Sequence, residues 1–303
     1  MRRALMVFNP HASSVSEPVR DVIAHALASE VKLDVAETKH RHHATELAAG
    51  AVADGFDLIA CLGGDGTLNE VVNGMAGAEV PVIPLPGGGT NVFARTMGLP
   101  KDPVEATSLV LERLHDDVEP ERINLGRVNG RAFTFCAGIG FDAAVVRAVE
   151  RRQRIKRRVG EPFFVYQAVR TFFFAYPRRN PPLSIEAGEE AVDGLHQVVV
   201  CNSNPYTFLG KRPFQLCPSA SSDRGLDYTA LRSFRTATVL RVVLRAFGAA
   251  GHPKMRSVRT AHDLDEFRVH ASRPVLYQVD GDFAGEASAF ELSSEPRALS
   301  VIC

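Results

Sequence analysis

The sequence predicts an α/β protein in which an N-terminal, Rossmann-like domain with a parallel sheet precedes an antiparallel β-sandwich domain. Three observations predict this fold class. Strand-like and helix-like segments alternate as far as Leu114, which is typical of a parallel sheet covered by helices. Beyond Pro120 the segments become short and β-like and are separated by Asn-Gly, Asp-Gly and Pro, as in antiparallel sandwiches. Two glycine turns, at 63–66 and 87–89, each follow a short apolar run.

Length and composition place the chain among globular proteins. With 303 residues it is long enough for two domains, and 45% hydrophobic with 23% charged residues is ordinary for folded proteins. Lys plus Arg and Asp plus Glu number 35 each, so the net charge gives no reason to expect a nucleic acid partner. The five cysteines are scattered without a CxxC pair, as in a reduced, cytoplasmic protein. We expect no signal peptide, because the N-terminal apolar run is too short, and no membrane span, because no segment reaches ~18 apolar residues.

The first domain is expected to alternate strands and helices along the chain. The predicted strands are 4–8, 31–38, 57–62 and 81–85. The predicted helices are one from a cap near Ser14 or Ser16 to Leu27, one at 44–53, one after the first glycine turn, one opening near Thr90 or Asn91, and one at 103–114. Ligands of parallel sheets bind beyond the carboxyl ends of the strands, where Asn9, Thr38 and both glycine turns are expected to lie.

The second domain is expected to consist of short strands with three helical insertions. The predicted strands are 122–128, 131–136, 183–187, 196–201, 226–231, 266–270, 275–279, 288–292 and 298–303. The predicted helical insertions are 141–156, 162–176 and 236–248. The texture changes near 120–129, so we place the domains at 1–125 and 126–303.

The first glycine turn combines the features of a phosphate-binding site. Glycines let the backbone turn tightly and approach an anion, and the helix that follows offers unpaired N–H groups and the positive end of its dipole. Asp65 lies within the turn, where a carboxylate can hold Mg²⁺ beside phosphates. The alternative is that Asp65 is a turn residue chosen for its backbone preferences. The second glycine turn and the run Thr67-Leu68-Asn69-Glu70 favour the phosphate site.

Neither turn matches the common nucleotide-binding motifs. No lysine stands where a P-loop has one, and 87–90 is not a GxGxxG fingerprint. A P-loop and a dinucleotide-binding site are therefore not expected.

Several motifs resemble the catalytic domain of the diacylglycerol kinase family, which includes bacterial lipid kinases, sphingosine kinases and ceramide kinases. The most specific is GGDGTLNEVVNG at 63–74, followed by PGGGTNVFARTMGLP at 86–100. Asn9-Pro10 and the segments 138–143, 223–227 and 279–283 continue the likeness in the family's order, so it covers nearly the whole chain.

The resemblance implies an ATP-dependent kinase that phosphorylates a lipid hydroxyl, with a nucleotide cleft between the two domains. It implies that the nucleotide contacts Asn9, Pro10, Thr38, Gly63, Gly64, Asp65, Gly66, Thr67, Leu68, Asn69, Gly89, Thr90 and Asn91. Asp65 would organise the Mg²⁺ of Mg-ATP. The family's Asp-Gly-Glu appears as Asp280-Gly281-Asp282, and one of these carboxylates would take the proton of the lipid hydroxyl. The choice between Asp280 and Asp282 stays open.

Two positions depart from the family pattern. The family often has an acidic residue where this chain has Val92, and another near the domain junction where it has Asn124. Either Asp65, the 280–282 carboxylates and water hold the metal alone, or the activity is altered. These departures keep open a non-catalytic regulator that binds nucleotide or lipid.

A second metal site is implied in the second domain. Residues 223–227 resemble an Asp-Gly-x-Leu-Asp loop that holds a structural Mg²⁺ in bacterial members, partly through backbone carbonyls. The resemblance places a carboxylate ligand at Asp223 and carbonyl ligands at Ala220 and Gly225. Arg224 stands where the family has a glycine, and a plain Asp-rich turn is the alternative.

A basic run precedes an aromatic one in the second domain. The basic residues are Arg147, Arg151, Arg152, Arg154, Lys156, Arg157 and Arg158, and aromatic residues follow at 163–166 and 172–176. This combination suits an anionic membrane surface, because basic residues are attracted to it and aromatic ones bury in the interface. The alternative is a solvated basic face followed by a core helix. The segment 40–43, His-Arg-His-His, is interpreted as a solvated turn without a metal.

Together the motifs predict a cytoplasmic, peripherally membrane-associated lipid kinase that uses ATP and Mg²⁺. Diacylglycerol, converted to phosphatidic acid, is the first acceptor expected, and a long-chain base or a glycolipid alcohol is the alternative. The predicted partners are a membrane lipid substrate and an anionic membrane surface, with no nucleic acid. A homodimer stays open.

Overall fold

The protein consists of two compact units. The structure, a computed structural model, describes residues 1–75, 77–152, 155, 159–248 and 250–303. Unit 1 comprises residues 1–123 and 297–303, and unit 2 comprises residues 124–296. Compared with the predicted domains, residues 124 and 125 belong to unit 2 and the C-terminal residues 297–303 belong to unit 1.

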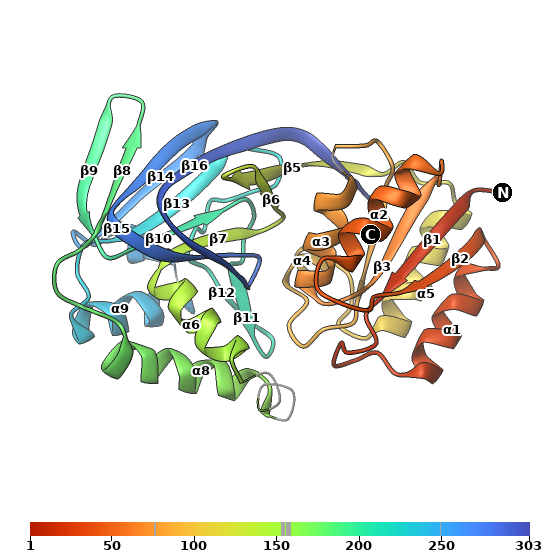
Figure 1. Cartoon of the computed structure of the whole chain (residues 1–303), viewed down its shortest axis with the longest axis horizontal. Coiled ribbons are helices and arrows are strands. Elements are labelled where there is room, and N and C mark those ends of the chain that lie inside the picture. The colour runs from red at the N-terminus through yellow and green to blue at the C-terminus, as the bar shows by residue number, and fades with distance from the viewer. Residues whose placement is uncertain (76, 153–154, 156–158, 249) are drawn as a thin grey trace. The chain divides into compact units, whose positions relative to one another are not determined.

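Unit 1 is a parallel sheet with helices on both faces (Figure 1). Its strands lie in the order β4-β3-β1-β2 and comprise β1 (Arg3–Phe8), β2 (Lys32–Glu37), β3 (Leu58–Gly63) and β4 (Val82–Pro86). Its helices are α1 (Glu17–Leu27), α2 (His43–Ala53), α3 (Asp65–Met75), α4 (Val92–Thr96) and α5 (Pro103–His115). The alternating strands and helices confirm the predicted α/β domain.

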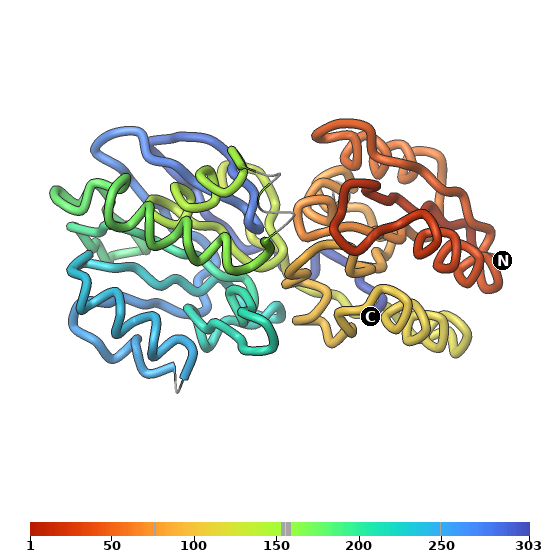
Figure 2. The backbone as a smooth tube through the Cα atoms, turned by 90° about the horizontal axis from the view of Figure 1, so that it is seen from below, coloured from red at the N-terminus to blue at the C-terminus, as the bar shows by residue number. Residues whose placement is uncertain are grey.

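Alternate residues of the buried strands pack against the helices on opposite faces of the sheet of unit 1. Met6, Ala60 and Ile83 lie in one hydrophobic cluster with Ile23 of α1 and Val110 of α5. Figures 1 and 2 show α1 and α5 side by side on that face, whereas α2 and α3 pack together on the other. Both faces of the sheet are thus covered by helices, so a ligand can approach it only where its strands end.

Unit 2 is built from antiparallel strands in a sandwich-like arrangement. Its main path runs β14-β13-β10-β7-β15-β16; β8 pairs with β15 and carries β9, and β5 pairs with β16 and carries β6. The strands are β5 (Glu121–Val128), β6 (Arg131–Phe133), β7 (Cys136–Gly140), β8 (Leu183–Ala187), β9 (Glu190–Leu195), β10 (Gln197–Cys201), β11 (Thr207–Leu209), β12 (Arg212–Phe214), β13 (Leu226–Leu231), β14 (Val258–Leu264), β15 (Glu266–Val279) and β16 (Asp282–Val301). Of these, β16 ends in unit 1, where Val301 pairs in parallel with Val82.

Two pairs of predicted strands are in fact single strands. The segments 266–270 and 275–279 form β15, whose register with β16 shifts between His270 and Val275. The segments 288–292 and 298–303 fall on β16, apart from the last two residues of the chain. The structure also adds β9, β11, β12 and β14, which are short or carry polar residues and so lack a strong apolar pattern.

The helices of unit 2 lie on one side of its strands (Figures 1 and 2). They are α6 (Phe141–Glu150), α8 (Glu161–Arg170), which continues as the π-helix η1 (Thr171–Ala175), α9 (Thr236–Ala246) and the short 3-10 helix η2 (His252–Lys254). Helix α6 contacts β15 and β7, and α8 contacts α6. None of the helices in the described part of the chain is long and apolar enough to cross a membrane.

Candidate functional site

The carboxyl ends of the parallel strands of unit 1 meet at one edge. The amide of Asn9, directly after β1, donates to the carbonyl of Leu62 at 3.1 Å, and the amide of Thr38, after β2, donates to the carbonyl of Phe8 at 2.9 Å. The amide of Gly87 donates to the carbonyl of Gly63 at 2.7 Å. The structure therefore brings Asn9, Thr38 and both glycine turns together.

The two glycine turns are packed backbone against backbone. A Cβ atom on Gly88 would lie 2.7 Å from the Cα of Gly64, and one on Gly87 would lie 3.0 Å from the Cα of Gly63. The void beneath the turns measures only about 10 Å³, room for one water at most. These glycines are thus required by the contact between the turns themselves, whatever else the turns bind.

The outer side of the second turn is open. Gly89 is exposed, and a Cβ atom there would meet only the hydroxyl of Ser13, at 3.7 Å. Thr90 is partly exposed beside it. At the first turn, the side-chain amide of Asn9 donates to the hydroxyl of Thr67 at 3.1 Å. An anion can approach this edge from the side of Gly89.

Asp65 holds the start of helix α4. Its two carboxylate oxygens accept hydrogen bonds from the amides of Val92 and Phe93, each at 3.0 Å. Those amides have no partner inside their own helix, so the carboxylate caps the helix and complements its dipole. Asp65 is partly exposed. Its first role in this fold is therefore to fix the segment that follows the second glycine turn.

Glu70, on the same helix as Asp65, caps a second helix. Its carboxylate accepts from the amides of His42, at 2.8 Å, and Ala44, at 3.3 Å, at the start of α2. Sequence reasoning missed this role, because the partners lie 28 and 26 residues away and no local motif links them. Helix α3 thus supplies one carboxylate to each of two neighbouring helices.

The predicted nucleotide contacts divide into buried and accessible groups. Gly63, Thr67, Leu68, Asn69 and Asn91 are buried, and the side-chain amide of Asn91 bonds both the N–H and the carbonyl of Gly88, at 2.7 and 2.8 Å. Partly or fully exposed are Asn9, Pro10, Thr38, Gly64, Asp65, Gly66, Gly89 and Thr90. Only this second group presents atoms to a ligand without rearrangement.

Asp280 is an anchor inside unit 2. It is 2% exposed, and its carboxylate accepts hydrogen bonds from the amide and hydroxyl of Thr134, at 2.7 and 3.0 Å, and from the amides of Phe135, at 3.0 Å, and Cys136, at 3.1 Å. Asp280 also adopts a left-handed backbone, with φ of 47°. These four bonds tie the turn at 280–282 to the start of β7.

Asp282 opens β16 on the other side of this turn and is partly exposed. The neighbouring residues are fixed from both sides. The amide of Gly281 donates to the side chain of Gln278 at 2.7 Å, and the amide of Phe283 donates to Glu150 of α6 at 2.7 Å. The turn therefore holds the backbone around Asp282 in one position.

Gln278 links this turn to a buried carboxylate on α6. Its amide nitrogen donates to Asp142 at 2.8 Å, and the hydroxyl of Tyr206 donates to the other oxygen of Asp142. Burial raises the pKa of Asp142, and the hydrogen bonds from Tyr206 and Gln278 oppose that rise. Asp142 lies in the 138–143 motif, to which sequence reasoning assigned no role.

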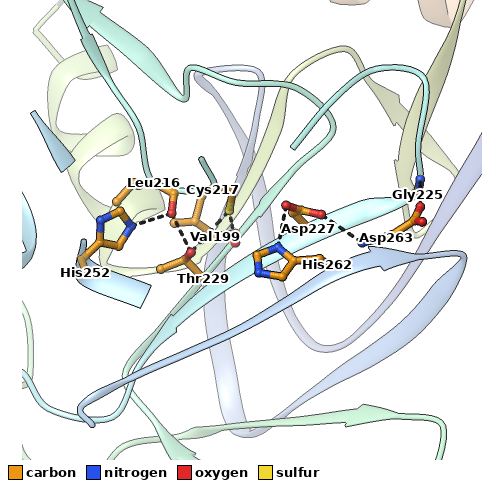
Figure 3. A network of polar contacts seen from close by, with 9 residues as sticks. All are labelled: Val199, Leu216, Cys217, Gly225, Asp227, Thr229, His252, His262 and Asp263. Atoms are coloured by element: carbon orange, nitrogen blue, oxygen red, sulfur yellow. Dashed lines mark hydrogen bonds and ion pairs between the residues drawn. The ribbon is translucent and has the colours of Figure 1, made fainter. Parts of the chain in front are cut away.

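The loop before β13 belongs to a network of polar contacts (Figure 3). Asp227 pairs with His262 at 2.9 Å and accepts the amide of Asp263 at 3.0 Å, while Asp263 accepts the amide of Gly225 at 2.8 Å. Farther along in the same view, His252 contacts the carbonyl of Leu216 at 2.8 Å. The loop conformation is thus set from β14.

Asp223, in that loop, accepts a hydrogen bond from the hydroxyl of Ser221, which lowers the pKa of its exposed carboxyl group. The side-chain amide of Asn124 donates to the carbonyl of Arg224 at 2.8 Å. An aspartate at position 124 would lack that donor, so this hydrogen bond explains why an asparagine fits here in place of the family's acidic residue. Metal binding by Ala220, Asp223 and Gly225 stays a prediction.

Two sequence features with charged side chains have different outcomes. Of the basic run, Arg147 pairs with Glu286 at 3.0 Å, while Arg154, Lys156, Arg157 and Arg158 lie outside the described residues.

Ligand atoms of His40, His43 and Glu46 lie within 4.8 Å of one another. However, Nδ1 of His43 accepts the amide of Lys39 at 3.0 Å, so this nitrogen is already engaged in a hydrogen bond.

Two family models match this chain. The diacylglycerol kinase catalytic domain matches residues 3–123, and the YegS C-terminal NAD kinase beta sandwich-like domain matches residues 136–303. The first match lies within unit 1, and the second covers most of unit 2 together with the C-terminal residues 297–303 of unit 1.

Named relatives match over most of the chain. A diacylglycerol kinase of Bacillus subtilis is 35% identical and the match covers 94% of this chain and 91% of the relative. One from Mycobacterium tuberculosis is 32% identical, over 86% and 81%. A solved structure of a putative diacylglycerol kinase from Bacillus anthracis has the same fold, with a TM-score of 0.78 at 21% identity, over 99% and 97% of the two chains.

Proposed function

The chain belongs to the family of diacylglycerol kinases and YegS-like lipid kinases, and we propose that it transfers the terminal phosphoryl group of ATP to the hydroxyl of diacylglycerol, giving phosphatidic acid. The names of its relatives support this acceptor. We place the enzyme in the cytoplasm, in peripheral contact with the membrane that contains its substrate.

The residues at the open edge of unit 1 fit a nucleotide. The start of α3 offers helix N–H groups beside Gly64 and Gly66, and Gly89 leaves space that a side chain would fill. Asn9, Thr38 and Thr90 add polar side chains around them. In this proposal the backbone amides bind the phosphates, and the polar side chains fix the orientation of the nucleotide.

Asp65 fits a magnesium ion only in part. A carboxylate has about four lone-pair sites, and the amides of Val92 and Phe93 occupy two of them. Asp65 is partly exposed, so in this proposal waters complete the shell around the metal. When bound, Mg²⁺ neutralises charge on the transferring phosphoryl group. Because Val92 has no side-chain oxygen, Asp65 is the carboxylate that holds the ion in unit 1 in this proposal, and its cap keeps the carboxylate oriented.

The proton of the lipid hydroxyl goes to Asp282 in this proposal. The observation that carries the choice is the set of four hydrogen bonds to Asp280, because a proton on that carboxylate would take a lone pair that already accepts one of these bonds from Thr134, Phe135 or Cys136. Asp282 is partly exposed, and its backbone is held by Gln278 and Glu150 through its neighbours. A base must be accessible and well positioned to act.

The test compares Asp282→Asn with the wild type in a transfer assay that uses labelled ATP, Mg²⁺ and a lipid mixture containing diacylglycerol, a long-chain base and a glycolipid. We expect labelled phosphatidic acid from the wild type, and a rate about 10²–10⁴-fold lower from the variant with ATP binding retained. Near-wild-type transfer by the variant removes Asp282 as the base. A different labelled lipid identifies another acceptor, and ATP binding without any labelled lipid identifies a regulator.

A further inference from the structure

A groove of about 1080 Å³ runs along unit 2 between η1 and the loop that leads into α9. Its basic and aromatic lining residues are Phe173, Phe174, Tyr176, Arg178, Arg179, His196, Arg232, Phe234 and Arg235. A groove with four guanidinium groups is suited to an anionic group.

The segment around the groove contains basic residues but no acidic ones. From Tyr228 to His262 the sequence contains seven Lys and Arg residues and no Asp or Glu. Arg179, Arg232 and Arg235 are exposed, and no carboxylate in the described part of the chain lies within ion-pair distance of them. Their charges are therefore available to a partner, in contrast to Arg147.

The helices beside the groove turn apolar side chains outward. On α9, Val242 and Ala246 are buried, whereas Leu240 and Leu244 are 56% and 64% exposed. They lie one turn apart on the outer face, with Arg241 and Arg245 next to them. Phe174 of η1 is 85% exposed, and the exposed apolar residues of α8 are Phe164, Val165, Tyr166 and Val169. Figures 1 and 2 show α8 and α9 on the same side of the strands of unit 2.

We propose that this face of unit 2, formed by α8, η1, the 232–236 loop and α9, binds the surface of a bilayer that contains anionic phospholipids. The lipid phosphates lie in the groove against Arg179, Arg232 and Arg235, and Phe174, Leu240 and Leu244 enter the acyl boundary. The alternation of exposed Leu and Arg on α9 is the pattern of helices that lie in a membrane interface. Charge complementarity selects the anionic bilayer, because a neutral surface offers no net charge to pair with the exposed arginines of this face.

This surface overlaps with the one that the sequence predicts, because the aromatic segments 163–166 and 172–176 lie on α8 and η1. It adds the 232–236 loop and α9, which sequence reasoning treats only as a helical insertion. The proposal does not rest on phosphoryl transfer, since the face can be tested without nucleotide.

The test is flotation of the full-length protein with vesicles of phosphatidylcholine alone or mixed with phosphatidylglycerol, without ATP. The charge variant combines Arg179→Gln, Arg232→Gln and Arg235→Gln, and its control combines Lys32→Gln, Lys101→Gln and Arg113→Gln on unit 1. With about 5-fold per basic residue, we expect the first triple to weaken binding to the mixed vesicles about 100-fold. The control should weaken it several-fold at most, and raising salt should weaken wild-type binding.

A second pair of variants separates insertion from charge. Leu240→Ser with Leu244→Ser should reduce binding to the mixed vesicles about 10-fold or more, whereas Val22→Ser with Val35→Ser, exposed on unit 1, should not. Equal wild-type binding to both vesicle types, or equal losses in test and control variants, overturns the proposal.

Two further outcomes point to other occupants and also overturn it. Concentration-dependent self-association in the absence of vesicles, abolished by the leucine variants, assigns the face to a second copy of the chain. Saturable binding of inorganic phosphate, lost in the arginine variant while vesicle binding is unchanged, assigns the groove to a soluble anion. A folded variant, checked by circular dichroism, is required in each arm.

Discussion

The two turns that carry the most specific motifs are stabilised in different ways. The glycine turns of unit 1 contact each other through their backbones, and a partly exposed carboxylate, Asp65, adds two hydrogen bonds. The turn at 280–282 in unit 2 depends on a buried carboxylate, Asp280, with four. In both turns, the carboxylate that the sequence suggests for chemistry, Asp65 or Asp280, stabilises the fold through hydrogen bonds to backbone amides.

This difference shows how to separate chemistry from architecture in such motifs. In unit 1, packing accounts for Gly87 and Gly88 but not for Gly89, which is exposed with space around it. In unit 2, four hydrogen bonds hold the buried Asp280, whereas Asp282 is partly exposed. The accessible residues of each motif are therefore the ones that we assign to the substrate and the nucleotide.

The largest effect on stability is expected from Asp280→Asn. One side of the new amide would turn an NH₂ group toward buried donors, so the variant loses acceptors for two hydrogen bonds to a charged group, at a cost of about 3–5 kcal/mol. The measurement is the free energy of unfolding in urea. Asp282→Asn is the matched control, with an expected change within about 1 kcal/mol. Equal changes in the two variants would contradict the anchor role of Asp280.

A second effect is expected from Gly88→Ala, with Gly89→Ala as its control. The new methyl group on residue 88 would lie 2.7 Å from the Cα of Gly64, a backbone atom that cannot move aside cheaply. Such overpacking costs about 1–3 kcal/mol. At Gly89 the methyl enters open space, so stability should stay within about 0.5 kcal/mol while ATP affinity falls. Thermal unfolding and ATP titration measure the two quantities. Equal destabilisation by Gly89→Ala and Gly88→Ala would contradict the free space around residue 89.

These contrasts also show what the sequence can and cannot predict. The parallel strands β1, β3 and β4 are visible because strands buried on both faces are continuous apolar runs. The bonds from Thr134 and Phe135 to Asp280 span 146 and 145 residues, and no local pattern encodes them. Likewise, the contact between the glycine turns and the capping by Glu70 arise only once the sheet is assembled. The meeting of Asn9, Thr38 and the glycine turns at the strand ends was therefore predictable, whereas the division of the predicted site residues into anchors and accessible groups was not.

A smaller effect is expected from Asp65→Asn. The variant keeps an acceptor for one of the two helix amides and loses the other, and water can reach this partly exposed position. Loss of a helix cap of this kind costs about 0.5–2 kcal/mol. Urea unfolding measures it, and the transfer assay measures the larger loss of activity that a metal-holding role implies. Should the stability loss match that of Asp280→Asn, burial would not distinguish the two carboxylates.

The smallest effect is a pH dependence from Asp142. Burial raises the pKa of this carboxyl group in the folded state above its unfolded value of about 4. Between these two pKa values the folded state binds more protons than the unfolded state. The free energy of unfolding therefore falls as pH rises through that window, with a slope of at most about 1.4 kcal/mol per pH unit for one proton. Above the folded pKa the cost is constant.

Asp142→Asn should remove this component of the slope, and Tyr206→Phe should extend it to higher pH, because the hydroxyl of Tyr206 stabilises the ionised form. Urea unfolding at intervals from about pH 4 to pH 8 measures the three curves, and the comparison uses their slopes, since both variants also lower stability at every pH by losing buried hydrogen bonds. Parallel curves would mean that Asp142 does not titrate differently in the folded protein. In that case the link from α6 through Gln278 to the turn at Asp282 would be an ordinary structural contact, without a titrating group behind it.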